Sequence, residues 1–213
     1  MTERKLNVWN KISLVTRIAI LVLGAIALTF TFINMFKNNN FVSFRYYTIQ
    51  SNLLVLAWVA ISIPLVFREK KWFFHSILHS AVVLVITITL IIFAILLDPL
   101  YNPTAINEII NNILLHYLIP SLAIFDFLVS NNEAEIKYRY VPFWLIYPVC
   151  YLVFAVLHGN ATGNYIYYFF DFGSIGMGIF VIMVIILAAM YILIGLLFAF
   201  INKKLRNRKT SKE

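Results

Sequence analysis

The sequence predicts an all-α, polytopic membrane protein in which six transmembrane helices form a bundle, as a single domain over residues 1–213. Apolar residues make up 62% of the chain and charged residues only 12%, whereas about a quarter of the residues of a soluble domain are charged. The mean hydropathy is +0.87. The charges lie between long apolar runs, a pattern typical of helices that cross a bilayer.

Six apolar runs are long enough to span a bilayer, which takes about 20 helical residues. They cover residues 13–36, 48–67, 73–97, 111–129, 141–157 and 175–201. The basic start of the chain leads into an apolar run without a small-residue cleavage site, so we expect a retained first span and not a signal peptide. The single cysteine, Cys150, excludes an internal disulfide and a cysteine-based metal site.

The basic residues predict the orientation of these spans. Of the 17 Lys and Arg residues, all but Lys37 and Arg45 lie on one side of the predicted spans. This asymmetry predicts cytoplasmic N- and C-termini and places Thr48, at the start of the second span, in the outer leaflet. The net charge of +8 follows mostly from this topology. The basic tail 203–212 is typical of a stop-transfer anchor, not of a nucleic-acid patch.

The second span begins with polar residues instead of a plain anchor. Thr48, Ser51 and Asn52 are spaced i, i+3, i+4 and therefore share one helix face, with Gln50 beside them. Lipid offers these groups no hydrogen-bond partner. We expect the stripe to face other helices or a polar cavity.

A second polar pair lies in the fourth span, where Asn112 and His116 are spaced i, i+4. At a rise of ~1.5 Å per residue, His116 lies about 7 Å below the outer end, a depth similar to that of Thr48. Pro120 removes one helix hydrogen bond and can kink the helix below His116.

Two further polar residues are expected on the outer side. His158 ends the fifth run, and Asp171 lies in the Gly- and aromatic-rich segment 159–173. This segment is too short to span, and its composition suits an interfacial loop over the outer mouth of the bundle. Because an acid among aromatic residues usually has a fixed partner, we expect Asp171 to turn toward Arg45 or His158.

An inner layer of polar residues is predicted from the third and fourth spans. His75 and His79 are one turn apart, and Asp126 lies at a depth similar to that of His79. The histidines are either a metal or proton site or a hydrogen-bonded pair, and two histidines alone do not complete a metal site. A buried carboxylate needs a partner, so we expect His79 to pair with Asp126. Arg17 is expected to reach the inner interface with its side chain, leaving the first helix a packing role.

The outer layer holds the minimum set for acyl transfer, namely a hydroxyl nucleophile, a general base and amide donors. His116 could take the proton from Thr48, and Ser51, Asn52 or Asn112 could donate hydrogen bonds to an oxyanion. The same residue types also form hydrogen bonds between membrane helices or line a binding or transport site. Composition and spacing alone favour the structural role.

Two short motifs resemble a known family. Residues 44–54, Phe-Arg-Tyr-Tyr-Thr-Ile-Gln-Ser-Asn-Leu-Leu, and residues 115–120, Leu-His-Tyr-Leu-Ile-Pro, followed by Asp126, resemble the bacterial six-span membrane family called Pr-six-Pr. That family is distantly similar to the eukaryotic androgen-induced membrane proteins, which are threonine hydrolases of fatty acid esters of hydroxy fatty acids.

The resemblance implies a lipid ester hydrolase of the bacterial cell membrane. Thr48 then corresponds to the nucleophile, and His116, four residues after Asn112, to the essential histidine. The triplet at 50–52 departs from the eukaryotic pattern, so the activity is carried over to Thr48 and His116 alone. The other outer polar residues are candidate substrate-binding residues: Gln50, Ser51, Asn52, Asn112, His158 and Asp171.

The predicted partners are membrane lipids and a lipid-like substrate, with no cofactor, no metal and no nucleic acid. A transporter or small-molecule-binding protein is the alternative, although the sequence lacks paired broken helices and a polar stripe along the full depth of a span. A non-catalytic membrane protein is the third class. Neither the substrate nor the oligomeric state follows from the sequence.

Overall fold

The computed structural model describes residues 8–66, 75–130 and 135–210, with side chains up to residue 206. These ranges are mostly helical and contain no β-strand. Six helical segments in them are long and apolar enough to cross a membrane: Val8–Lys37, Tyr47–Leu65, His75–Leu100, Ile106–Val129, Tyr138–Thr162 and Met177–Arg206. The predicted all-α, six-span fold is confirmed, and the protein is a multi-pass integral membrane protein. The basic residues predicted at 4–5, 68–71 and 212 lie outside the described residues.

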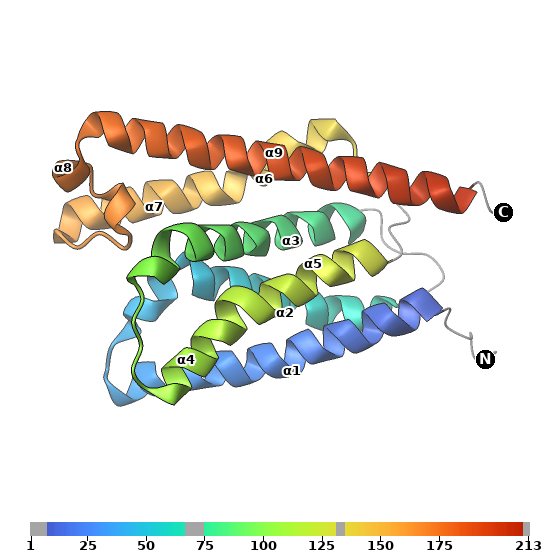
Figure 1. Cartoon of the computed structure of the whole chain (residues 1–213), viewed down its shortest axis with the longest axis horizontal. Helices are drawn as coiled ribbons and strands as arrows, with labels where there is room; N and C mark the ends of the chain where they lie inside the picture. The colour runs from blue at the N-terminus through green and yellow to red at the C-terminus, as the bar shows by residue number, and fades with distance from the viewer. Residues whose placement is uncertain (1–7, 67–74, 131–134, 211–213) are drawn as a thin grey trace. The chain divides into compact units, whose positions relative to one another are not determined.

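The contacts divide the chain into two compact units, Met1–Ala134 and Glu135–Glu213. The single domain over residues 1–213 stays a prediction. In the first unit, α1 (Val8–Lys37) packs against α2 (Tyr47–Leu65) and α5 (Ile119–Val129), and α3 (His75–Ile92) packs against the same two helices (Figure 1). The four helices bury a common apolar core, which includes Ile20, Val55, Leu84, Ile86, Ile119 and Phe127.

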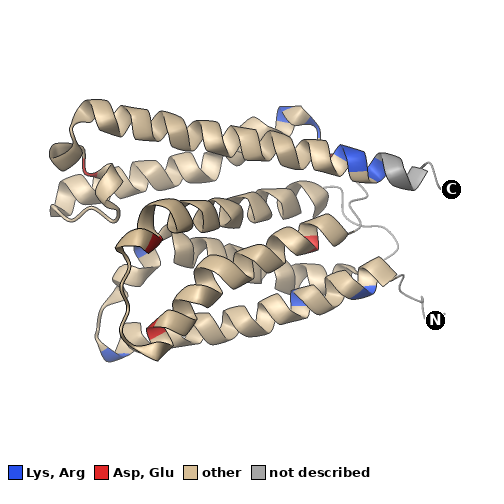
Figure 2. Ribbon diagram, in the orientation of Figure 1, with Lys and Arg blue, Asp and Glu red and all other residues tan. Residues whose placement is uncertain are grey.

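Charged residues are sparse along the helices of the first unit, as Figure 2 shows. At Gly24 of α1, an added Cβ would clash with the Leu56 side chain of α2. The glycine therefore lets the two helices approach closely, as small residues do between membrane helices.

Two π-helical turns interrupt the helices near the candidate site. The segment η2 (Phe93–Leu97) continues α3, and η4 (Leu114–Leu118) joins α4 (Ile106–Ile113) to α5. Pro120 gives a reason for the second turn, because it has no N–H to continue the α-helical ladder. The irregularity predicted at Pro120 thus includes His116 itself. Single π-turns inside α-helices occur frequently at functional sites.

The second unit begins with η5 (Tyr138–Tyr140), followed by α6 (Val141–Trp144) and α7 (Ile146–Thr162). Pro148 has no N–H for the carbonyl of Trp144, where α6 ends. Gly163 closes α7 in the left-handed conformation (φ 71°), and its N–H donates to the Gly159 carbonyl at 2.8 Å.

The chain then forms η6 (Tyr168–Phe170), α8 (Phe172–Ile175) and α9 (Met177–Thr210). Near the start of this unit, the backbone N–H of Ile136 donates to Asn202 of α9 at 3.0 Å. Basic residues gather toward the C-terminal end of α9 (Figure 2): Lys203, Lys204 and Arg206.

Candidate functional site

The structure brings Thr48 and His116 together. Thr48 lies in the first turn of α2, and His116 lies in the π-turn η4. The Thr48 Oγ1 atom is 3.1 Å from the His116 Nε2 atom, which is within the reach of a general base. The side chains of Thr48 and His116, which the sequence places at similar depth, therefore face one another.

A second contact of His116 defines the direction of this hydrogen bond. Its Nδ1 atom lies 3.2 Å from the backbone carbonyl oxygen of Asn112. A carbonyl oxygen only accepts, so Nδ1 carries the hydrogen, and in the neutral ring Nε2 is the acceptor. The Thr48 hydroxyl therefore donates to His116. A nucleophile hydrogen-bonded to a base, with the base oriented by a third group, is the arrangement that nucleophilic catalysis requires.

Phe93 orients the imidazole plane of His116. Its ring stacks on the imidazole with centroids 3.7 Å apart and an interplanar angle of 21°. Phe93 is buried and begins the other π-turn, η2. The two π-turns thus meet at His116, which is held at its face by Phe93 and at its nitrogens by Thr48 and Asn112. Phe93 could not be predicted from the sequence, because nothing distinguishes it from other apolar span residues.

Ser51 and Asn52 are fully buried and hold the backbone of the site. The Nδ2 atom of Asn52 donates to the carbonyl oxygens of Thr48 at 2.8 Å and of Leu115 at 3.1 Å. The Ser51 hydroxyl donates to the Thr48 carbonyl at 2.9 Å and lies 2.8 Å from the Thr89 hydroxyl of α3. The predicted stripe therefore faces other helices.

Not all side chains predicted as oxyanion donors have an N–H or O–H group free to bind an oxyanion. Ser51 and Asn52 already donate to carbonyl groups, which leaves Asn112 as the candidate donor. The Asn112 side chain is half-buried, and no hydrogen bond to it is found among the described residues. Gln50 donates to the carbonyl of Phe44 at 3.0 Å and so links α2 to η1 (Phe41–Arg45).

His158 and Asp171 lie in the second unit. The Asp171 carboxylate accepts hydrogen bonds from the Ser174 hydroxyl at 2.6 Å and from its backbone N–H at 3.1 Å, and so caps α8. The hydrogen bond from the Ser174 side chain lowers the pKa of Asp171 below its usual value. Asp171 therefore has a fixed partner, but among the described residues of this unit that partner is Ser174 and not His158.

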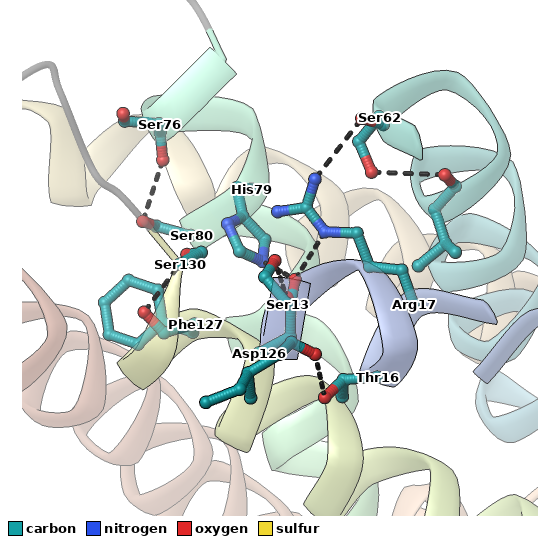
Figure 3. A network of polar contacts seen from close by, with 12 residues as sticks. Ser13, Thr16, Arg17, Ser62, Ser76, His79, Ser80, Asp126, Phe127 and Ser130 are labelled. Carbon is teal, nitrogen blue, oxygen red and sulfur yellow. Dashed lines mark hydrogen bonds and ion pairs between the residues drawn. The ribbon is translucent and has the colours of Figure 1, made fainter. Parts of the chain in front are cut away.

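A second polar cluster lies about 21 Å along α2 from Thr48, because Ser62 comes 14 positions after Thr48 in the helix. Its centre is the buried Asp126 carboxylate, which accepts a hydrogen bond from Arg17 Nε at 2.9 Å (Figure 3). Ser13 also donates to this carboxylate, and Arg17 Nη1 donates to the Ser62 carbonyl at 3.3 Å. The cluster joins α1, α2 and α5.

The expected role of Arg17 is wrong. Its side chain is 1% exposed and forms an ion pair with Asp126 instead of reaching the interface. The reason is depth: Arg17 lies nine residues after the first residue of α1, about 14 Å along the helix axis. A charge at that depth needs a counter-charge, and Asp126 is the only acid inside the six predicted runs.

The predicted pairing of His79 with Asp126 is confirmed. His79 Nε2 lies 3.2 Å from Asp126 Oδ2, and both side chains are buried. Trp58 of α2 stacks on His79 with ring centroids 5.8 Å apart and contacts His75 at 5.0 Å. Among the described residues, no three His, Cys, Asp or Glu side chains come together as metal ligands. The cluster is a four-helix network of hydrogen bonds around one ion pair.

Comparisons with protein-family models, with curated proteins and with solved structures found no match to this chain. The resemblance of residues 44–54 and 115–120 to the six-span family therefore stays a prediction. A function has to be inferred from the Thr48–His116 pair and its surroundings.

Proposed function

We propose that this protein is an intramembrane ester hydrolase in which Thr48 is the nucleophile and His116 the general base. One observation carries the proposal: Thr48 Oγ1 lies 3.1 Å from His116 Nε2, while His116 Nδ1 faces the Asn112 carbonyl. This geometry leaves the basic nitrogen of a neutral imidazole directed at a hydroxyl, which is how serine and threonine nucleophiles are activated.

In the first half-reaction, Thr48 Oγ1 attacks the ester carbonyl carbon while its proton passes to His116 Nε2. The tetrahedral intermediate then collapses, the C–O bond to the alcohol breaks, and His116 returns the proton to the leaving alcohol. An acyl ester on Thr48 remains. His116 is again neutral at the end of this step, so that the same base serves the second half-reaction.

In the second half-reaction, water attacks the acyl carbon as His116 Nε2 takes its proton. The bond to Thr48 Oγ1 breaks, and His116 returns the proton to that oxygen. The products are a carboxylic acid, an alcohol and the original enzyme. No metal or redox partner is needed for this balance.

Surrounding groups suit the charges that develop during the reaction. The ring face of Phe93 lies against His116, and a cation over an aromatic face gains about 0.5–2 kcal/mol. The Asn112 amide is the candidate donor to the oxyanion, which is usually the group that most needs stabilisation.

The substrate class follows from the location of the pair and from the family resemblance. Thr48 and His116 lie in apolar, membrane-spanning segments, so a lipid ester can approach from the bilayer. The lysine and arginine asymmetry supports cytoplasmic termini and, with them, a position of the pair in the outer leaflet. The proposed substrates are fatty acid esters, and the proposed location is a bacterial cell membrane.

The test is labelling of the purified, full-length protein with a fluorophosphonate probe, followed by an assay of fatty acid ester cleavage. We expect Thr48→Ala to abolish labelling, and His116→Gln to slow it by a hundredfold or more, the usual range for loss of a general base. Thr87→Ala is the matched control, because Thr87 is also buried and, within the part of the chain that the structure describes, its hydroxyl bonds only the Val83 carbonyl of its own helix.

The alternative is that the pair is a hydrogen bond between two membrane helices, in a non-catalytic, ligand-binding or transport protein. The bonds of Ser51 and Asn52 to backbone carbonyls favour such a structural role for those two residues. If the wild-type protein is folded but neither reacts with the probe nor cleaves esters, this alternative stands. Labelling that persists in Thr48→Ala would also reject Thr48 as the nucleophile.

A further inference from the structure

We infer that Asn52 is the residue that positions His116 against Thr48. It does so by binding a backbone carbonyl that the π-turn and Pro120 together leave without a partner in its own helix. The inference rests on the proposed function for its catalytic meaning. The structural part, that Asn52 controls the geometry of the Thr48–His116 pair, can be tested separately.

The carbonyl in question belongs to Leu115, the residue before His116. In an α-helix it would accept from the N–H of Ile119, four residues later. In η4, however, the Ile119 N–H donates to the carbonyl of Leu114, as in a π-turn. The next N–H that could reach Leu115 is that of residue 120, which is a proline and has none.

Asn52 supplies the missing donor from α2. Its Nδ2 atom donates to the Leu115 carbonyl at 3.1 Å. The two residues are 0% and 3% exposed, so water does not readily replace this bond. A buried carbonyl without a donor is unfavourable, and the π-turn at His116 is therefore stabilised where Asn52 is present.

The same nitrogen also fixes the other member of the pair. Asn52 Nδ2 donates to the carbonyl of Thr48 at 2.8 Å, so the Thr48 and Leu115 carbonyl oxygens lie within about 6 Å of each other. Both acceptors are carbonyls, which determines that the NH₂ group and not the amide oxygen faces them. One amide group thus sets the separation between the backbone of the nucleophile and the backbone just before the base.

Among the described residues, Asn52 forms hydrogen bonds to backbone carbonyls and none to Thr48 Oγ1 or to the His116 ring, so it is a positioning residue. Asn52→Asp tests this role with almost no change in size, because a carboxylate cannot donate to two carbonyls. Asn52→Leu removes the polar group altogether. Thr87→Ala again serves as the control for loss of a buried hydrogen bond at a position away from the pair.

The first measurement is the ¹⁵N spectrum of histidine-labelled, full-length protein, with the His116 signals identified by their loss in His116→Gln. We expect wild-type His116 to be neutral with its hydrogen on Nδ1 alone. In Asn52→Asp and Asn52→Leu, we expect a mixture of tautomers in which the Nε2–H form is populated. Spectra of His116 that are unchanged in both folded variants would overturn the inference.

The second measurement separates positioning from a general loss of fold. We expect the rate constant of fluorophosphonate labelling to fall at least tenfold in Asn52→Asp, while the fraction of protein labelled at completion stays equal to that of Thr87→Ala. A reduced final fraction with an unchanged rate constant would mean that Asn52 only supports folding. If the wild-type protein is not labelled at all, the proposed function fails, and the ¹⁵N spectra still decide the role of Asn52.

Pro120→Ala provides a variant in which the inference remains testable if Asn52→Leu folds poorly. An alanine at 120 restores an N–H and gives the Leu115 carbonyl a donor within its own helix. We expect Asn52→Leu to lower thermal stability less in the Pro120→Ala background than in the wild type. An equal loss in both backgrounds would show that the Leu115 carbonyl does not depend on Asn52.

Discussion

The buried ion pair between Arg17 and Asp126 can be tested by a double-mutant cycle made of Arg17→Met, Asp126→Leu and the double variant. The replacements are apolar and of similar length, so that they fill the space without a charge. Both side chains are at most 2% exposed. The cycle therefore measures an interaction that neither water nor salt screens strongly.

The expected magnitudes follow from the hydrogen bonds in Figure 3. Removing one partner of a buried ion pair costs about 3–5 kcal/mol. Asp126→Leu should lie at the upper end, because it leaves the Arg17 charge, the Ser13 hydroxyl and the His79 N–H without their shared acceptor. Arg17→Met should lie at the lower end, because Ser13 and His79 still donate to the carboxylate.

The double variant should be more stable than Asp126→Leu alone, because no uncompensated charge remains. Replacing a whole buried pair by apolar residues is often close to neutral, and we expect a loss of about 2 kcal/mol or less. The assay is unfolding of the purified protein in mixed micelles by increasing detergent denaturant, followed by tryptophan fluorescence. If the two single losses simply add in the double variant, Arg17 and Asp126 do not stabilise the fold through their interaction with each other.

Two further predictions concern the topology and the second unit. The orientation can be tested with single cysteines in a Cys150→Ser background. A cysteine in place of Asn39 should react with a membrane-impermeant reagent in intact cells, and a cysteine in place of Lys204 should react only after lysis. The reverse pattern would refute the predicted orientation. The hydrogen bond from the Ser174 side chain lowers the pKa of Asp171. The Asp171 cap therefore stabilises α8 at any pH above the usual pKa of an aspartate, and this stabilisation is lost as the pH falls through the lowered pKa. At neutral pH, the Ser174 amide should therefore be less protected from hydrogen exchange in Asp171→Ala than in the wild type. This difference should disappear in acid. Equal protection of the two proteins at neutral pH would exclude the cap.

Depth along a span could be predicted well from the sequence. The rise per residue of a helix is constant, so residues at equal distance from the ends of their spans are found at equal depth. This reasoning anticipated the contacts of Thr48 with His116 and of His79 with Asp126. It failed for Arg17 because depth along one helix does not reveal that Asp126 of α5 lies beside it.

The sequence by itself determined the six apolar spans, the all-α class and the polar positions within each span. These properties depend on composition and helical periodicity, which are local. Helix adjacency is not local, since it depends on how side chains of separate helices pack. Only the tertiary structure therefore decided that Phe93 stacks on His116 and that Arg17 reaches Asp126.

The Leu115 carbonyl is a second case in which the sequence determined one part of the hydrogen bonding and the tertiary structure the other. Pro120 in the sequence determines that a helix donor is missing nearby, but not which carbonyl loses its partner. That depended on the π-turn, which shifts the Ile119 N–H to Leu114. It depended equally on α2, whose Asn52 lies opposite the Leu115 carbonyl, because a buried polar group takes its partner from whatever helix the fold places beside it.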